Sequence, residues 1–410
     1  MKILIVDDSQ DKAQQLARVI VEVDPSAQVT HAPTAHDGFW KITQEASSQE
    51  PFNLVLLDLV LPLSLGQEPS EAGSVWFVKE AQRKIPGDSF PLIVGTTKYL
   101  ESIAKVEDTF REYLRRVIYV GDADDRWLRQ IGYALREARP KAQQRSLSAQ
   151  GQGSGVDVAL VTALQMPEFE ELVDALGGGD PYYIKETGES WLHCKVDLAG
   201  GRQAEVMAAC ADEMGMPAMA ALVTRLCMVC RPKKLLLAGI MGGNPARVGL
   251  TDLVVVEETW NSNAGKISEA GFEPDLKLQR CDQQLANLAK LVATDDLLMK
   301  LWREWKGEKP NQLPRFHRGA VACSPAVIAD GQTFSKLEDQ KRKIYGVEME
   351  AFGCYDAVCR LGSIAPKVVC IKSVCDLGDQ MKNDRYQRFC AHISASVMVS
   401  FIKDERFLDC

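Results

Sequence analysis

Acidic residues stand at the ends of two apolar runs in the first part of the chain. Asp7 and Asp8 end the run KILIVDD, and Asp58 lies near the end of NLVLLDLVLP. Because ligands of open parallel sheets bind beyond the carboxyl ends of the strands, we expect these carboxylates to converge. Converging carboxylates repel one another unless a hard cation joins them, and Mg²⁺ prefers such oxygen ligands. The sequence therefore predicts a magnesium site at Asp7, Asp8 and Asp58, where one carboxylate could accept a phosphoryl group.

Two segments of the second part indicate sugar recognition. LLLAGIMGG ends in Gly242 and Gly243, and glycines at a strand end let backbone N–H groups approach a sugar or phosphate closely. In YGVEMEAFG, Glu348 and Glu350 flank Met349. Two acids at this spacing can accept hydrogen bonds from vicinal hydroxyls, while the thioether offers an apolar surface to a sugar ring. The alternative is that both acids simply favour the positive end of a helix.

A third segment, CIKSVCDLGD, carries Asp376 and Asp379 at the end of an apolar run. Desolvation favours the protonated form of a carboxyl, and a protonated carboxyl near neutral pH can act as a general acid. The alternative interpretation is an aspartate that only forms a turn.

The apolar runs also predict the elements that position these residues. A chain of 410 residues suggests two or three domains. ARPKAQQRSLSAQGQGSGVD is rich in Gln, Ser and Gly, which is linker composition. We therefore predict an α/β domain at 1–140 with a doubly wound parallel five-stranded sheet, a linker at 141–156, and a larger α/β/α domain with a mixed sheet at 157–410.

Composition excludes several classes of protein. Hydrophobic residues are 46% and charged residues 25% of the chain, which is ordinary globular composition. The net charge of −8 argues against general DNA binding, which needs a basic face. Neither a membrane helix nor a signal peptide is expected, so we expect a cytoplasmic protein. Cys227 and Cys230 form a C-x-x-C within a helical pattern, and we expect them to pack in the core rather than bind metal.

The segments IVDD, LLDLVLP and PLIVGTT together resemble the receiver domain of two-component response regulators over nearly all of residues 1–140. The resemblance implies that Asp58 is the phosphoacceptor of a partner histidine kinase. It implies that Asp7 and Asp8 hold Mg²⁺, with the carbonyl of Val60 as a further ligand, and that Thr96 is the switch hydroxyl.

One feature of receivers is missing. They usually carry a lysine at the end of the last strand, whereas this chain has VIYVGDAD, with Gly121 or Asp122 near that position. Either a lysine from elsewhere substitutes, for which Lys98 is a candidate, or the switch is atypical. A degenerate receiver that serves only dimerisation is the alternative.

The segments GIMGG, RGAVACS, VEMEA and SVCDLGD, in this order, resemble the nucleoside phosphorylase and nucleosidase superfamily over roughly residues 156–405. The resemblance implies that Asp376 donates a proton to the purine ring. It implies that Glu350, helped by Met349, binds the ribose hydroxyls, and that Gly242 and Gly243 lie beside the sugar. No cofactor is expected for the glycosidic cleavage itself.

Water or phosphate could be the attacking group. Nucleosidases hold the water with a glutamate after the first strand, and Glu168 stands one residue later than the usual spacing, with Pro167 at the expected place. We expect Glu168 to serve this purpose. A phosphorylase would instead need converging arginines, for which the candidates are Arg202, Arg247, Arg315 and, as a substrate-binding residue, Arg318.

The combination of the two domains resembles the response regulator of Detocs anti-phage systems, whose nucleosidase effector cleaves ATP to adenine and ribose triphosphate. ATP would need local cations, and Lys266 and Lys382 join the arginines as candidates. A methylthioadenosine, adenosylhomocysteine or AMP nucleosidase, a nucleoside phosphorylase, and a non-catalytic nucleotide sensor are the alternatives. We also expect a homo-oligomer.

Overall fold

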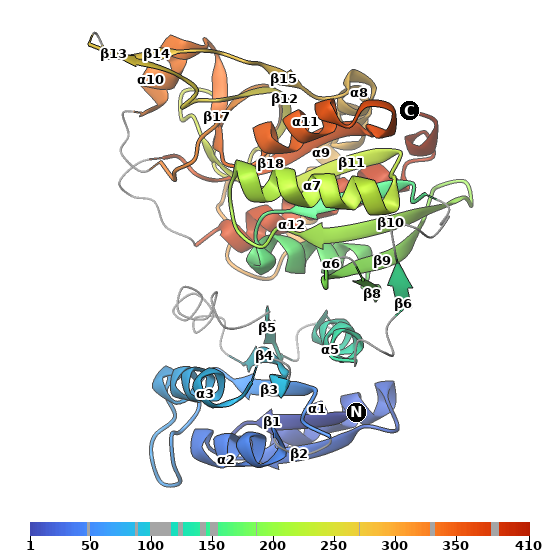
Figure 1. The fold of residues 1–410 in the computed structure, drawn as a ribbon, viewed down its shortest axis with the longest axis vertical. Helices are drawn as coiled ribbons and strands as arrows, with labels where there is room; N and C mark the ends of the chain where they lie inside the picture. Colours follow the sequence, from blue (N-terminus) through green and yellow to red (C-terminus); the bar gives the residue numbers. More distant parts are fainter. Residues whose placement is uncertain are drawn as a thin grey trace. The chain divides into compact units, whose positions relative to one another are not determined.

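The computed structural model describes two compact units, Met1–Arg145 and Ser146–Cys410 (Figure 1). The described residues are 1–46, 50–86, 89–98, 116–121, 126–139, 145–147, 155–185, 187–269, 271–328, 333–378 and 385–410. Most of the predicted linker therefore lies outside the described residues, and each unit is treated by itself. Among the described helices, none combines the length and the apolar character that crossing a membrane requires.

The N-terminal unit contains the predicted five-stranded parallel sheet. The strands run in the order β2-β1-β3-β4-β5, and every neighbouring pair is parallel. Their bounds are β1 (Lys2–Val6), β2 (Gln28–Ala32), β3 (Leu54–Asp58), β4 (Leu92–Thr97) and β5 (Arg116–Tyr119). All five residues of β3 are buried, as expected for a continuous apolar run that is covered on both faces.

The helices of this unit are α1 (Gln10–Val23), α2 (Ala35–Ala46), α3 (Glu71–Lys84) and α5 (Arg126–Glu137). Helix α1 packs against α5, and α2 packs against α3. The first helix begins where it does because the Ser9 side chain accepts a hydrogen bond from the Lys12 N–H and caps it. The strand order reverses between β1 and β3, so their carboxyl ends form the crevice in which doubly wound sheets bind ligands.

The C-terminal unit contains a mixed sheet in the order β15-β12-β16-β17-β11-β7-β10-β9-β8, and β18 pairs with both β11 and β12. The sheet strands are β7 (Val158–Thr162), β8 (Asp180–Ile184), β9 (Ser190–Asp197), β10 (Gln203–Cys210), β11 (Lys234–Gly243), β12 (Leu253–Asn261), β15 (Gln279–Arg280), β16 (Phe316–Cys323), β17 (Ile344–Glu348) and β18 (Lys367–Asp376). A separate hairpin is formed by β13 (Gly265–Ser268) and β14 (Gly271–Pro274), and β6 (Arg145–Leu147) spans the boundary between the units.

Five of these strands close into a ring, because β11 pairs with β18, β18 with β12, β12 with β16, β16 with β17, and β17 with β11. Strands β11 and β18 are parallel, so both end on the same rim of the ring. Strand β17 meets β11 only through its last residues, where Val347 pairs with Gly242. This rim therefore gathers the ends of three predicted motifs.

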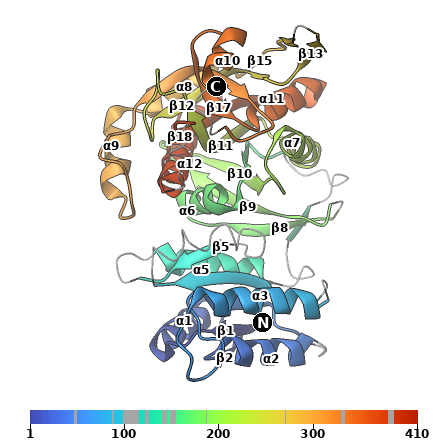
Figure 2. The ribbon, with the colours of Figure 1, turned by 90° about the vertical axis from the view of Figure 1, so that its left-hand side faces the viewer.

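Helices cover the sheet on both sides, and α7 and α12 lie on opposite sides of β10 and β11 in Figure 2. The helices are α6 (Glu170–Leu176), α7 (Met216–Cys230), α8 (Gln283–Val292), α9 (Asp295–Glu304), α10 (Thr333–Gln340), α11 (Ala351–Arg360) and α12 (Gln387–Lys403). Cys227 and Cys230 are buried on α7, and burial raises the pKa of each thiol to about 12. Thiols that stay protonated are poor metal ligands, so the expectation of core packing is confirmed.

Candidate functional site

Gly242 lies between Asp376 and Val347 on the rim of the ring. A Cβ added at Gly242 would lie 3.2 Å from Asp376 Oδ1 and 3.5 Å from Val347 Cγ1. Strands β18 and β17 flank β11 here, so they are separated by two strand spacings, about 10 Å. Asp376 and Val347, the first residue of VEMEA, thus lie on the same rim.

Asp376 is held in a tight turn directly after β18. It is buried, and its Oδ1 accepts a hydrogen bond of 2.9 Å from the Gly378 N–H. Gly378 has a φ of +65°, and a Cβ there would lie 2.6 Å from the Phe334 ring on α10. Only glycine combines this backbone conformation with such close packing, so the turn fixes the direction of the Asp376 carboxyl.

A buried lysine on β18, four residues before Asp376, forms ion pairs with three glutamates. Lys372 Nζ on β18 lies 3.0 Å from Glu350 Oε2, 3.8 Å from Glu348 Oε2 and 3.9 Å from Glu168 Oε1. All four side chains are almost completely excluded from solvent. Burial opposes the lysine's charge, but the glutamates outweigh it and hold the pKa of Lys372 well above its usual value. Burial raises the pKa of both Glu168 and Glu348, although Lys372 acts in the opposite direction.

Glu168 reaches this cluster through an irregular turn. Gln165–Phe169 forms an irregular turn after β7, in which Met166 has an extended backbone and the Phe169 N–H bonds to the carbonyl of Leu164 at 3.0 Å. This turn carries the Glu168 side chain back to the end of β7, although Glu168 stands one residue later than the resemblance leads us to expect. The Glu168 carboxylate accepts hydrogen bonds from three backbone N–H groups, of Ala163, Leu164 and Ile240, at 2.8–2.9 Å.

The two glutamates of VEMEA have different surroundings. The Glu348 carboxylate accepts hydrogen bonds from the N–H groups of Glu350 and Ala351 at 2.8–3.0 Å, and so occupies the N-terminus of α11. These are the hydrogen bonds that the helix-end interpretation predicts for Glu348. Glu350 bonds through Oε1 to the Gly215 N–H at 3.0 Å and through Oε2 to Lys372. Met349 is half-buried between them.

A cavity of about 680 Å³ lies beside this segment. Ser324 lines this cavity, and its backbone N–H donates a 2.8 Å hydrogen bond to the carbonyl of Glu348 in VEMEA. The cavity therefore lies next to VEMEA. Helix α10 contacts both the cavity and the turn that holds Asp376. Its Leu337 lines the cavity, and its Phe334 packs on Gly378 in that turn. The rest of the wall is mainly apolar with a few polar groups: Ser262, Asn263, Ile267, Phe272, Ala326, Val327, Ile328, Lys336 and Gln340.

Of the predicted arginines, Arg318 and Arg202 have partners away from this site, whereas Arg247 lies beside α10, which also carries cavity residues. Arg318 on β16 donates to Glu257 at 2.9 Å and to Asn287 at 2.7 Å, which are not site residues. Arg202 pairs with Asp409 at 2.9 Å. Arg247 lies 3.9 Å from Glu338, and the backbone N–H of Arg315 bonds to Asp252. Lys266 is exposed on β13, whereas Asp379 and Lys382 lie outside the described residues.

Sequence reasoning missed Lys372 and Gly239. A Cβ at Gly239 would overlap Glu168 Oε1 and lie 2.9 Å from Lys372 Nζ, so this glycine makes room for the ion cluster. The signal for Lys372 was visible in CIKSVCD, a lysine inside an apolar run. A fully buried lysine almost always needs an acidic partner, and Glu168, Glu348 and Glu350 supply it here.

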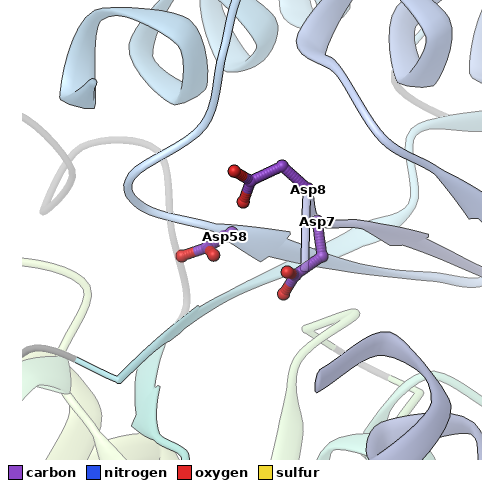
Figure 3. A group of neighbouring side chains, drawn as sticks. All are labelled: Asp7, Asp8 and Asp58. Atoms are coloured by element: carbon purple, nitrogen blue, oxygen red, sulfur yellow. The ribbon is translucent and has the colours of Figure 1, made fainter. Parts of the chain in front are cut away.

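The acidic residues of the N-terminal unit converge as predicted (Figure 3). One carboxylate oxygen from each of Asp7, Asp8 and Asp58 lies within 4.8 Å of the others. Asp7 and Asp58 are buried, and Asp8 is exposed. Burial, reinforced by Asp7 and opposed by Lys12, raises the pKa of Asp58 to about 6. This hard oxygen donor set fits Mg²⁺.

A lysine is present in this cluster, but it is not Lys98. Lys12 Nζ on α1 lies 2.9 Å from both Asp7 Oδ2 and Asp58 Oδ2, whereas Lys98 is exposed. The suggestion of Lys98 as the substitute is therefore replaced by Lys12. Thr96 pairs with Asp58 in the register of β3 and β4, and its hydroxyl is buried without a hydrogen-bond partner.

Comparison with known proteins identifies relatives of the C-terminal unit and of the whole chain. The family model described as the phosphorylase superfamily matches residues 157–402. A Sinorhizobium fredii protein named "Uncharacterized protein y4jS" is 28% identical over 97% of this chain and 98% of its own length.

Solved structures with a similar fold include two from Helicobacter pylori. The 5′-methylthioadenosine/S-adenosylhomocysteine nucleosidase is 16% identical over 63% of this chain and 98% of that one, with a TM-score of 0.48. The futalosine hydrolase is 17% identical over 60% and 96%, with a TM-score of 0.48.

Proposed function

Because the chain belongs to the phosphorylase superfamily, we propose that its C-terminal unit hydrolyses the N-glycosidic bond of a purine nucleoside or nucleotide. The observation that carries this proposal is the buried group formed by Glu168, Lys372 and Glu350, in which Lys372 lies on the same strand, β18, that ends at Asp376. It offers a proton donor at one end of a nucleoside and fixed carboxylates at the other. This is the charge arrangement that glycosidic cleavage needs.

Each of these groups has a part in the reaction. The bond between the sugar C1′ and the purine nitrogen breaks, and its electron pair leaves with the base. Asp376 donates its proton to the purine ring and so neutralises the departing base. Glu350 accepts hydrogen bonds from the ribose hydroxyls and stabilises the positive charge that develops on the sugar. Glu168 holds a water molecule, takes one of its protons, and lets its oxygen bond to C1′.

The charges around Glu168 favour water over phosphate as the attacking group. Three carboxylates surround a single lysine there, so an incoming phosphate anion would be repelled in a site of low dielectric constant. Two of the candidate arginines have partners elsewhere, Arg318 with Glu257 and Arg202 with Asp409. These observations support a hydrolase rather than a phosphorylase.

ATP, cleaved to adenine and ribose 5′-triphosphate, is our preferred substrate. Lys336 in the cavity wall supplies a cation of the kind that a triphosphate needs. The apolar side chains of Phe272 and Val327 in the same wall favour the second candidate. That candidate is a nucleosidase for methylthioadenosine or adenosylhomocysteine, which carry thioether groups instead of phosphates.

We propose further that the N-terminal unit controls this activity. A partner histidine kinase would phosphorylate Asp58, with Mg²⁺ held by Asp7 and Asp8. When bound, Mg²⁺ would neutralise the phosphoryl oxygens. Phosphorylation adds negative charge at one carboxylate and can shift a two-state element. A switch of this kind suits an activity that would harm the cell if it were constant, such as ATP destruction during phage infection.

The test measures base release by chromatography from ATP, AMP and methylthioadenosine, with and without an acyl-phosphate donor and with and without inorganic phosphate. We expect adenine and the free sugar, not the sugar 1-phosphate, with ATP turned over fastest after phosphorylation. Asp376→Ala should abolish release, whereas Asp296→Ala, an exposed aspartate on α9, should not. Unchanged release by Asp376→Ala would reject the site, and unchanged regulation by Asp58→Ala would reject the switch.

A further inference from the structure

Lys12 occupies the centre of the acidic cluster in the N-terminal unit. Its side chain is only 1% exposed, and Nζ is equidistant from Asp7 Oδ2 and Asp58 Oδ2, at 2.9 Å. The remaining oxygens of these carboxylates are also engaged. Asp7 Oδ1 accepts a hydrogen bond from the Ser9 N–H at 3.0 Å, and Asp58 Oδ1 accepts one from the Val60 N–H at 3.3 Å. Each carboxylate therefore has one oxygen in a backbone hydrogen bond and the other in an ion pair with Lys12, whose Nζ makes no hydrogen bond of good geometry.

The position of Lys12 is set by the helix that carries it. Ser9 caps α1, and Lys12 stands in its first turn, directly beyond the carboxyl end of β1. A lysine side chain is long enough to reach water from most surface positions. Burying an ammonium group is costly unless it is paired, so two buried carboxylates at equal distances are a strong reason for it to stay inside.

We infer that Lys12 is a tethered cation that neutralises the acidic cluster in the absence of metal and competes with a divalent metal ion for Asp7 and Asp58. The inference rests on the proposed metal site of this unit, but on neither phosphorylation nor the activity of the C-terminal unit. Two effects act in the same direction. A metal ion must take carboxylate oxygens that Lys12 already contacts, and the ammonium charge repels any second cation a few ångströms away.

Replacement of the ammonium group by a group of similar shape tests the inference. Lys12→Met keeps the length of the side chain and removes its charge. We expect Mn²⁺, titrated calorimetrically into the full-length protein, to bind at least about tenfold more tightly to Lys12→Met than to the wild type. Lys79→Met, which changes an exposed lysine on α3 of the same unit, should bind Mn²⁺ like the wild type.

Thermal unfolding provides a second readout. Without Lys12 the carboxylates lack a counter-charge, so Lys12→Met should unfold at a lower temperature than the wild type in EDTA. Mn²⁺ should then raise its unfolding temperature by more than it raises that of the wild type. Equal Mn²⁺ affinity in Lys12→Met and the wild type, or weaker binding in the variant, would overturn the inference.

If Lys12→Met does not fold, the same comparison can be made in the Asp58→Asn variant. Asp58→Asn removes one buried negative charge, so loss of the lysine is better tolerated there. We expect Asp58→Asn/Lys12→Met to bind Mn²⁺ more tightly than Asp58→Asn alone. Equal affinities of these two proteins would show that Lys12 does not compete. Because no phosphodonor or nucleotide is present, failure of the proposed enzymatic function would leave these measurements unchanged.

Discussion

Lys372→Met is the substitution that most directly tests how the candidate active site is held together. Methionine approximates the volume of the lysine but removes the charge that Glu168, Glu348 and Glu350 share. All of these groups are buried. Removing one partner of a buried ion pair costs about 3–5 kcal/mol, because the remaining charge is left uncompensated. We expect the C-terminal unit to lose this amount of its free energy of unfolding.

Hydrogen exchange is the suitable assay, because it reports on the C-terminal unit separately from the N-terminal one. Amides of β11 and β18 that exchange through global opening of the unit should exchange between about a hundred and a few thousand times faster in the variant. The pKa of Lys372 is raised in the folded state above its usual 10.5. Its contribution is therefore fully present below pH 10.5 and is lost as the pH rises through the folded-state pKa. Measurement near pH 7 captures all of it.

Lys367→Met on the same strand is the matched control, since Lys367 is only half-buried and contacts the Gln284 side chain. It should change exchange by less than about threefold. Combining Lys372→Met with Glu350→Gln should restore part of the lost stability, because one unpaired charge is removed together with its partner. If Lys372→Met and Lys367→Met behave alike, the ion cluster does not stabilise the site and our account of it is wrong.

Other predictions concern activity. Gly239→Ala places a methyl group against Glu168 and Lys372, and we expect at least about a hundredfold loss of kcat/KM in steady-state kinetics, as for a displaced catalytic group. Since burial raises the pKa of Glu168 above 4.5, a general base there loses activity as the pH falls through that raised value. The acid limb of the kcat/KM profile should have its midpoint above pH 4.5, and Glu168→Gln should be inactive across it. Lys336→Met should raise KM for ATP several-fold and leave KM for methylthioadenosine unchanged; equal effects would argue against a phosphate contact.

The fold could be predicted from the sequence because its central strands are continuous runs of apolar residues. KILIV, NLVLLD, PLIVGTT and RVIY are all strands of the N-terminal sheet, and KKLLLAGIMGG and KVVCIKSVCD are strands of the C-terminal one. Burial on both faces demands continuous apolar residues, and that demand is local in the sequence. Convergence of Asp7, Asp8 and Asp58 followed from the same logic, since parallel strands end together.

The partners of charged groups could not be predicted in this way. Lys12 looks like any polar residue in the first turn of a helix, and only tertiary packing turns it towards Asp7 and Asp58. Glu348 and Glu350 differ by two positions in one motif, yet one bonds to the start of α11 and the other to Lys372. The irregular turn before α6 has no signature in hydrophobic periodicity, because its backbone is neither helical nor extended throughout.

Both units contain buried carboxylates that repel one another, and in both a buried lysine neutralises part of this negative charge. Each gathers carboxylates where water is scarce, and each places a lysine among them, Lys12 with Asp7 and Lys372 with Glu350. The outcomes differ with access to solvent. Asp8 is exposed, so an external cation can reach the first cluster and displace the lysine. The side chains of Glu168, Glu348 and Glu350 are only 1–6% exposed, so Lys372 remains their counter-charge and holds the carboxylates in place when a sugar reaches Glu350.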